Sequence, residues 1–122
     1  MSDKTIAERL EVKRERRLAL LDAPEPVDRA IGAIDRRAEL GSADIAVLFA
    51  RDHAALKAKL PECLTSITPL AILWVAYPKL SSPLAGDLDR ETVRRVATDH
   101  GMKIVSQIAV DRDWSAMRLK RA

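Results

Sequence analysis

The stretch that decides the fold is Leu70-Ala71-Ile72-Leu73-Trp74-Val75-Ala76-Tyr77-Pro78-Lys79, the most apolar run in the chain. Prolines stop it at both ends, at Pro69 and Pro78, and its residues do not alternate between apolar and polar. A short run that is apolar on both faces is typical of a strand with helices above and below it. A buried helix is the alternative, but the run is short and enriched in β-branched and aromatic residues. We therefore expect the central strand of a parallel sheet.

Further strands and helices alternate around this run. The expected strands are Arg17–Leu21, Ala43–Phe49, Lys103–Val110 and Trp114–Arg121. The expected helices are Val27–Ile34, His53–Leu60 after the N-cap Asp52, and Arg90–His100 after the N-cap Asp89. Strand–helix alternation predicts an α/β fold, a three-layer Rossmann-like and mostly parallel sheet, closed here by a C-terminal antiparallel hairpin.

Several boundaries stay open in the sequence. Thr5 and Glu8 have the spacing of a capping box that starts a short helix. The charged run Lys13–Arg17 either prolongs this helix or turns into the first strand, and we prefer the turn. Ala38–Leu40 has the pattern of a short edge strand. Pro61 either ends the middle helix or opens a second turn that reaches Ile67.

Composition indicates one ordinary domain over residues 1–122, with 48% hydrophobic residues. No apolar run approaches the roughly 20 residues of a membrane span, and the charged amino terminus has no secretory pattern. A single cysteine, Cys63, excludes an internal disulfide. These features predict a cytoplasmic protein with no membrane contact.

Charge and aromatic content argue against nucleic-acid binding. The chain has 21 Lys and Arg against 18 Asp and Glu, and only 3% aromatic residues. The cations are scattered and interspersed with acids, and four aromatic side chains are too few for a base-stacking platform.

Specific segments resemble known families. They are Leu20–Pro24, Ala43–Phe49, Trp74–Lys79, Asp87–Leu88 and Val110–Leu119. On these segments the chain, from about Thr5 to Arg121, resembles small bacterial proteins catalogued only as a domain of unknown function. The order of its elements resembles the carboxyl-terminal part of the class I, S-adenosylmethionine-dependent methyltransferase fold. Lys13–Arg17 departs from the resemblance, because a glycine-bearing turn is expected there. The resemblance implies a truncated methyltransferase-like fold and no particular activity.

The cofactor turn of such enzymes is altered here. The methyltransferase resemblance implies a glycine-rich turn after the first strand, where the backbone approaches the ligand with positive φ. Residues 22–26 instead contain Pro24 and Pro26 and no glycine, and proline lacks an amide donor. Asp35 or Glu39 matches only loosely the acidic residue expected to bind ribose. We therefore expect no cofactor bound in the usual way.

Candidate ligand-binding residues gather at the carboxyl ends of the expected strands. They are Asp22, Pro24, Tyr77, Lys79, Asp87 and Trp114. Alternatively, Lys79 is solvated or paired with Asp87, and the buried ring of Trp114 packs the hairpin against the core. We assign no catalytic and no metal-binding residue, because His53 and His100 lie at helix ends and Cys63 fits a small buried hydrophobe.

Two functions follow from these features. The first is a non-catalytic module that binds a small molecule or a protein. The alternative is an enzyme with a site at Lys79, Asp87 and Asp22, which could be S-adenosylmethionine-dependent. Strands near the sheet edge also allow a homodimer.

Overall fold

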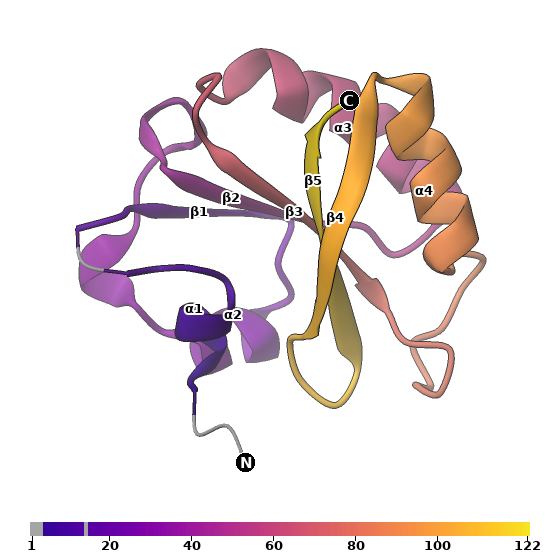
Figure 1. The fold of residues 1–122 in the computed structure, drawn as a ribbon. Coiled ribbons are helices and arrows are strands. Elements are labelled where there is room, and N and C mark those ends of the chain that lie inside the picture. The colour runs from indigo at the N-terminus through magenta and orange to yellow at the C-terminus, as the bar shows by residue number, and fades with distance from the viewer. Residues whose placement is uncertain (1–3, 14) are drawn as a thin grey trace.

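The predicted central strand lies in the middle of one five-stranded sheet (Figure 1). The strand order is β1 (Leu18–Leu21), β2 (Ile45–Phe49), β3 (Ile72–Pro78), β5 (Trp114–Arg121) and β4 (Met102–Ala109). Strands β1, β2 and β3 are parallel, and β5 runs antiparallel to both of its neighbours, β3 and β4. This computed structural model describes residues 4–13 and 15–122, and it confirms the α/β fold with a terminal antiparallel hairpin.

Helices cover both faces of the sheet, which gives three layers (Figure 1). Helices α1 (Ile6–Arg9) and α2 (Glu25–Ile31) lie on one face, and α3 (His53–Ser66) and α4 (Arg90–Asp99) lie on the other. Successive strand residues therefore enter different cores: Val47 packs in the core beneath α2, and Leu48 packs in the core beneath α3. This arrangement explains why β2 and β3 show no polar alternation.

The amino-terminal segment is tied to the centre of the sheet. Trp74 of β3 is buried and donates its indole N–H to the Leu10 carbonyl oxygen at 3.0 Å. Thr5 and Glu8 form the predicted capping box. After α1, Glu11 has a φ of 76°, and the described residues of the Lys13–Arg17 run form a turn rather than a helix. The preference for a turn is thus confirmed, with position 14 outside the described residues.

Several boundaries differ from the sequence-based expectation. Helix α3 continues through Pro61 to Ser66, because Leu60 and Cys63 on either side are buried in the core and this packing outweighs one lost backbone hydrogen bond. Helix α2 starts earlier, at Glu25, and ends at Ile31 because Gly32 leaves the helix with a φ of 67°.

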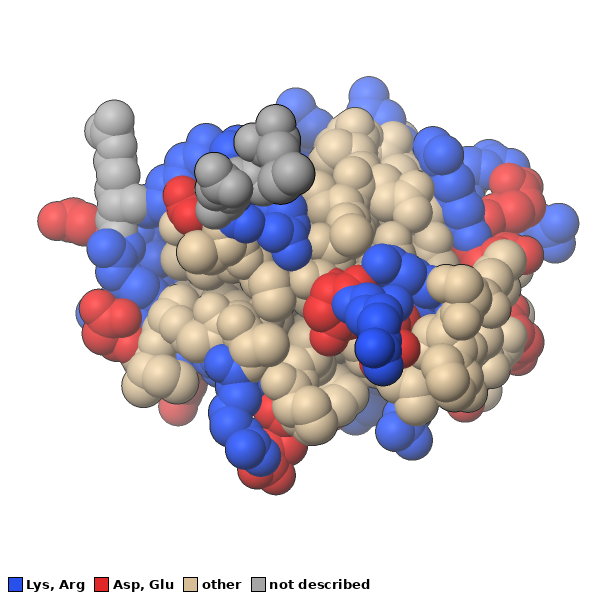
Figure 2. Space-filling view, turned by 90° about the horizontal axis from the view of Figure 1, so that it is seen from below, with Lys and Arg blue, Asp and Glu red and all other residues tan. Residues whose placement is uncertain are grey.

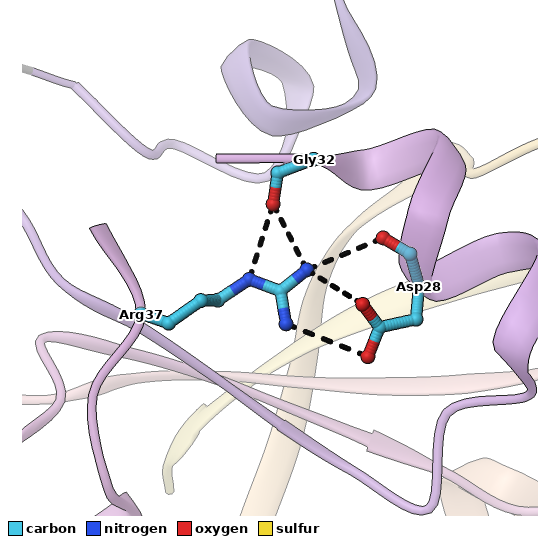
Figure 3. A network of polar contacts seen from close by, with 3 residues as sticks. All are labelled: Asp28, Gly32 and Arg37. Atoms are coloured by element: carbon cyan, nitrogen blue, oxygen red, sulfur yellow. Dashed lines mark hydrogen bonds and ion pairs between the residues drawn. The ribbon is translucent and has the colours of Figure 1, made fainter. Parts of the chain in front are cut away.

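The expected edge strand at Ala38–Leu40 is wrong. Arg37 makes one isolated parallel bridge to Leu18, and two 3-10 turns, one before it and one after it, take the place of a strand. These turns are η1 (Ile34–Arg36) and η2 (Leu40–Ser42). The Arg37 guanidinium holds this connection against α2 by bonding the Gly32 carbonyl oxygen at 2.9 and 3.1 Å and the Asp28 carboxylate at 2.9 Å (Figure 3).

The last strand is an interior strand. β5 hydrogen-bonds β3 on one side and β4 on the other, so β4 and β1 are the two edge strands of the sheet. Residues Trp114 to Met117 are buried, and more exposed residues alternate with buried ones only from Met117 to Lys120. Among the described residues, no helix combines the length and the apolar character needed to cross a membrane.

Candidate functional site

The carboxyl ends of β1 and β2 form a switch point of the sheet. The helix after β1 packs on one face and the helix after β2 packs on the other. Ligands of open α/β sheets bind at such points. Here apolar side chains fill the α2 side: the rings of Phe49 and Trp114 meet edge to face at 5.2 Å, and Ala23 packs against the same core. Trp114, only 3% exposed, packs in this core.

The turn after β1 keeps one property of a glycine turn. Asp22 adopts a φ of 59°, in the left-handed region, which aspartate tolerates better than most residues. Pro24 is the N-cap of α2 and makes no side-chain capping bond. Asp22 lines a depression of about 240 Å³ together with Lys59 and Cys63. Desolvation raises the pKa of the Cys63 thiol to about 11.

Asp87 has a structural partner. Its carboxylate accepts a hydrogen bond from the His53 backbone amide at 2.8 Å, in the first turn of α3. Asp52 accepts the Ala55 amide at 2.8 Å. Among the described residues, Asp87 makes no ion pair with Lys79. The loop between β3 and α4 is therefore fastened to the start of α3.

Tyr77 and Lys79 meet in a separate depression of about 390 Å³, here named the Lys79 depression. Its lining residues are Tyr77, Lys79, Leu80, Ser81, Asp89, Arg90, Gln107 and Ser115. The polar floor is connected: the Gln107 amide donates to the Ser115 hydroxyl at 3.0 Å and to the Tyr77 hydroxyl at 3.5 Å. Burial raises the pKa of Tyr77, so its hydroxyl stays protonated at neutral pH.

Two cations at this depression, Lys79 and Arg90, make no ion pair within the described residues. Neither the Lys79 ammonium nor the Arg90 guanidinium makes a hydrogen bond or an ion pair within the described part of the chain. The one acidic lining residue, Asp89, is the N-cap of α4, and its carboxylate accepts the Thr92 amide at 2.8 Å. Hydrogen bonds from Thr92 lower the pKa of Asp89, which therefore stays ionised. The lining thus carries two positive charges and one negative charge.

The structure divides the six predicted residues. Tyr77 and Lys79 lie together, whereas Asp22 lines another depression, Asp87 caps a helix and Trp114 lies in the core beneath α2. Sequence reasoning missed Arg90, Gln107 and Ser115. Ser115 lies opposite Tyr77 only because β5 pairs with β3, and no local pattern indicates that pairing.

One face of the molecule shows how the charges are distributed. Figure 2 shows Lys and Arg side chains interspersed with Asp and Glu around uncharged surface. On this face, charges of both signs therefore lie side by side.

Solved structures share the fold at low sequence identity. The mitomycin 7-O-methyltransferase MmcR is 13% identical, with a TM-score of 0.57, and the match covers 87% of this chain and 42% of that one. The B. subtilis tRNA methyltransferase TrmK is 8% identical, with a TM-score of 0.58, over 96% of this chain and 64% of that one. A protein of the NADB-Rossmann superfamily from Streptococcus agalactiae is 8% identical, with a TM-score of 0.54, over 100% of this chain and 70% of that one.

The chain spans less than two thirds of the first two of these proteins. At such identities the likeness shows the fold alone, a methyltransferase-like one. No curated protein matches the chain. A family model described as "Protein of unknown function (DUF3052)" matches residues 7–122.

Proposed function

The chain belongs to the DUF3052 family of proteins of unknown function, and from that premise we propose that it is a non-catalytic module that binds a small anionic molecule. The proposed site is the Lys79 depression, on a methyltransferase-like fold.

The observation that carries this proposal is a pair of cations at one depression, neither of which makes an ion pair within the described residues, beside a single carboxylate. Lys79 and Arg90 line it together with the hydroxyl of Tyr77 and the amide of Gln107. A carboxylate or phosphate placed there accepts charge-assisted hydrogen bonds, which are about twice as strong as neutral ones.

Binding fits these side chains better than catalysis. The raised pKa of Tyr77 keeps it from acting as a base at neutral pH, and the Asp89 carboxylate is engaged at the start of α4. The alternative enzyme needs Lys79, Asp87 and Asp22 together. Asp87 already bonds His53, and Asp22 lines a different depression.

A thermal-shift titration tests the proposal. The panel contains S-adenosylmethionine, its demethylated product, common nucleotides and small di- and tricarboxylates, each with wild type, Lys79→Ala and the control Lys57→Ala. Lys57 is exposed, whereas Lys79 is half-buried, and it lies on α3 outside the depression lining. We expect an anionic compound to raise the Tm saturably in wild type and in Lys57→Ala but not in Lys79→Ala, whose unliganded Tm stays unchanged.

Three outcomes contradict the proposal. A shift that persists in Lys79→Ala places the ligand elsewhere. A shift with S-adenosylmethionine, accompanied by formation of the demethylated product, supports the enzyme instead. Absence of any shift across the panel contradicts an anionic small molecule as ligand.

A further inference from the structure

A second concave surface lies at the other end of the sheet, where β3 begins and β5 ends. The register brings these ends together, since Leu73 of β3 pairs with Leu119 of β5. A groove of about 310 Å³ opens there beside the end of α3. We name it the amino-end groove. It is separate from the Lys79 depression, with which it shares no lining residue.

The floor of the amino-end groove is apolar. Leu73, Met102 and Leu119 lie beneath it and are at most 5% exposed. Leu64 and Ile67 of the α3 end form a half-buried wall. At the rim stands Leu70, whose residue surface is 95% exposed, the most exposed of the large hydrophobic residues in the described chain. Leu70 follows Pro69, so a short rigid turn presents it to solvent.

The charged side chains that line the amino-end groove are all cations. Arg118, Lys120 and Arg121 line the groove, and no acidic residue does. Within the described residues, none of these three side chains makes an ion pair or a hydrogen bond. Lys103 lies directly opposite Lys120 across the β4–β5 pair, which is an unfavourable arrangement of like charges.

This concentration of cations is local. The chain as a whole has 21 cations and 18 acids, and several cations elsewhere pair with acids, as Arg37 does with Asp28. An anionic partner at the amino-end groove relieves the repulsion between Lys103 and Lys120. A partner with complementary charge therefore carries carboxylates or phosphates beside an apolar group.

We propose that the amino-end groove docks a short segment of another protein that carries an apolar side chain flanked by acidic residues. The apolar side chain enters between Leu70 and the floor, and the carboxylates face Arg118, Lys120 and Arg121. Both edges of β5 are already paired, so recognition is by side chains and not by addition of a strand. A nucleic acid leaves the apolar floor unused, and none of the lining residues is aromatic.

Selection from a phage-displayed library of random twelve-residue peptides tests this docking surface. We expect enrichment of peptides that combine Asp or Glu with Leu, Ile, Phe or Met. The strongest peptide is then titrated by fluorescence polarisation against wild type, Leu70→Asp and Lys120→Glu. Each substitution is expected to weaken binding at least tenfold, and added salt is expected to weaken it further.

Matched controls carry the same chemical change elsewhere. Ile34→Asp replaces another exposed hydrophobic residue, and Lys57→Glu reverses another exposed lysine. Both are expected to leave the affinity within twofold of wild type. Because Leu70 and Lys120 are exposed, the folded state survives their replacement, and an unchanged Tm verifies it.

Four outcomes overturn the proposal. They are the absence of any enriched peptide, enrichment of basic peptides, binding that survives both groove variants, and tighter Lys120-dependent binding of a twenty-nucleotide single strand or of phosphatidylserine vesicles. None of these outcomes depends on the ligand of the Lys79 depression, so the two proposals fail separately.

Discussion

The Asp87 carboxylate accepts the backbone amide of His53 at 2.8 Å, so a loop that follows β3 caps the helix that follows β2. The first turn of a helix leaves backbone amides without partners, and Asp52 satisfies only the Ala55 amide. Asp87 thereby joins two connections that are 34 residues apart along the chain. It stabilises the fold rather than facing the Lys79 depression.

Replacing Asp87 by alanine is expected to lower the free energy of unfolding by about 1 kcal/mol, the usual cost of losing a side-chain cap. Asp87→Asn keeps a side-chain oxygen acceptor and should lose less. Urea denaturation measures both values. Asp35→Ala, at an exposed position on η1, serves as the control and should have almost no effect. An unaffected Asp87→Ala protein contradicts the capping role.

Gly86 lies so close to the β2–α3 turn that a side chain does not fit. A Cβ atom there approaches the Arg51 carbonyl oxygen to 3.0 Å. We expect Gly86→Ala to lower the free energy of unfolding by roughly 1–3 kcal/mol, because backbone must move. Gly41→Ala is the matched control, since its Cβ comes no closer than 3.6 Å to the Ser66 carbonyl oxygen. Equal stability of the two variants excludes a tight contact at Gly86.

The Arg37 guanidinium makes a compact set of bonds to the end of α2 (Figure 3). Arg37→Ala should lower the free energy of unfolding by about 2 kcal/mol, since hydrogen bonds to charged groups are worth more than neutral ones. Arg37→Lys should recover only part, because an ammonium lacks the planar fork. The neighbouring Arg36→Ala is the control in the same chemical denaturation series. A double-mutant cycle with Asp28→Ala that shows no coupling contradicts the interaction.

Cys63 should be chemically inert in the folded protein. Its side chain is buried, and desolvation raises its pKa to about 11. At pH 8 only about one thiol in a thousand is then ionised, and the thiolate is the reactive form. Reaction with a disulfide reagent should therefore be slow at pH 8, rise with pH, and become fast in denaturant. Rapid native-state labelling at pH 8 contradicts this.

Local sequence patterns predicted the regular elements well. The apolar runs Ala43–Phe49 and Leu70–Lys79 contain β2 and β3, and Asp52 and Asp89 cap the helices that they were expected to cap. These features depend on short-range properties: burial on both faces and side-chain acceptors for free amides.

Long-range packing accounts for the differences. Pro61 looks like a helix end in the sequence, but buried neighbours on the core face carry the helix past it. The candidate site was predicted only in part for the same reason. Asp22 and Asp87 follow strands at the same sheet edge as Lys79, yet hydrogen bonding and the route of the loop direct them elsewhere. Gln107 and Ser115 join Tyr77 through the position of β5, which the sequence does not indicate.

The interior position of β5 also sets an order of events during synthesis. The ribosome makes this strand after the other four, but β4 reaches the rest of the sheet only through it. Until β5 has emerged, β3 has one unpaired edge and the β4–β5 hairpin has not formed. The growing chain can then pair only β1, β2 and β3, and apolar surface stays exposed. Native closure of the sheet therefore waits for β5, and the nascent protein is most prone to aggregation before this strand is available to pair.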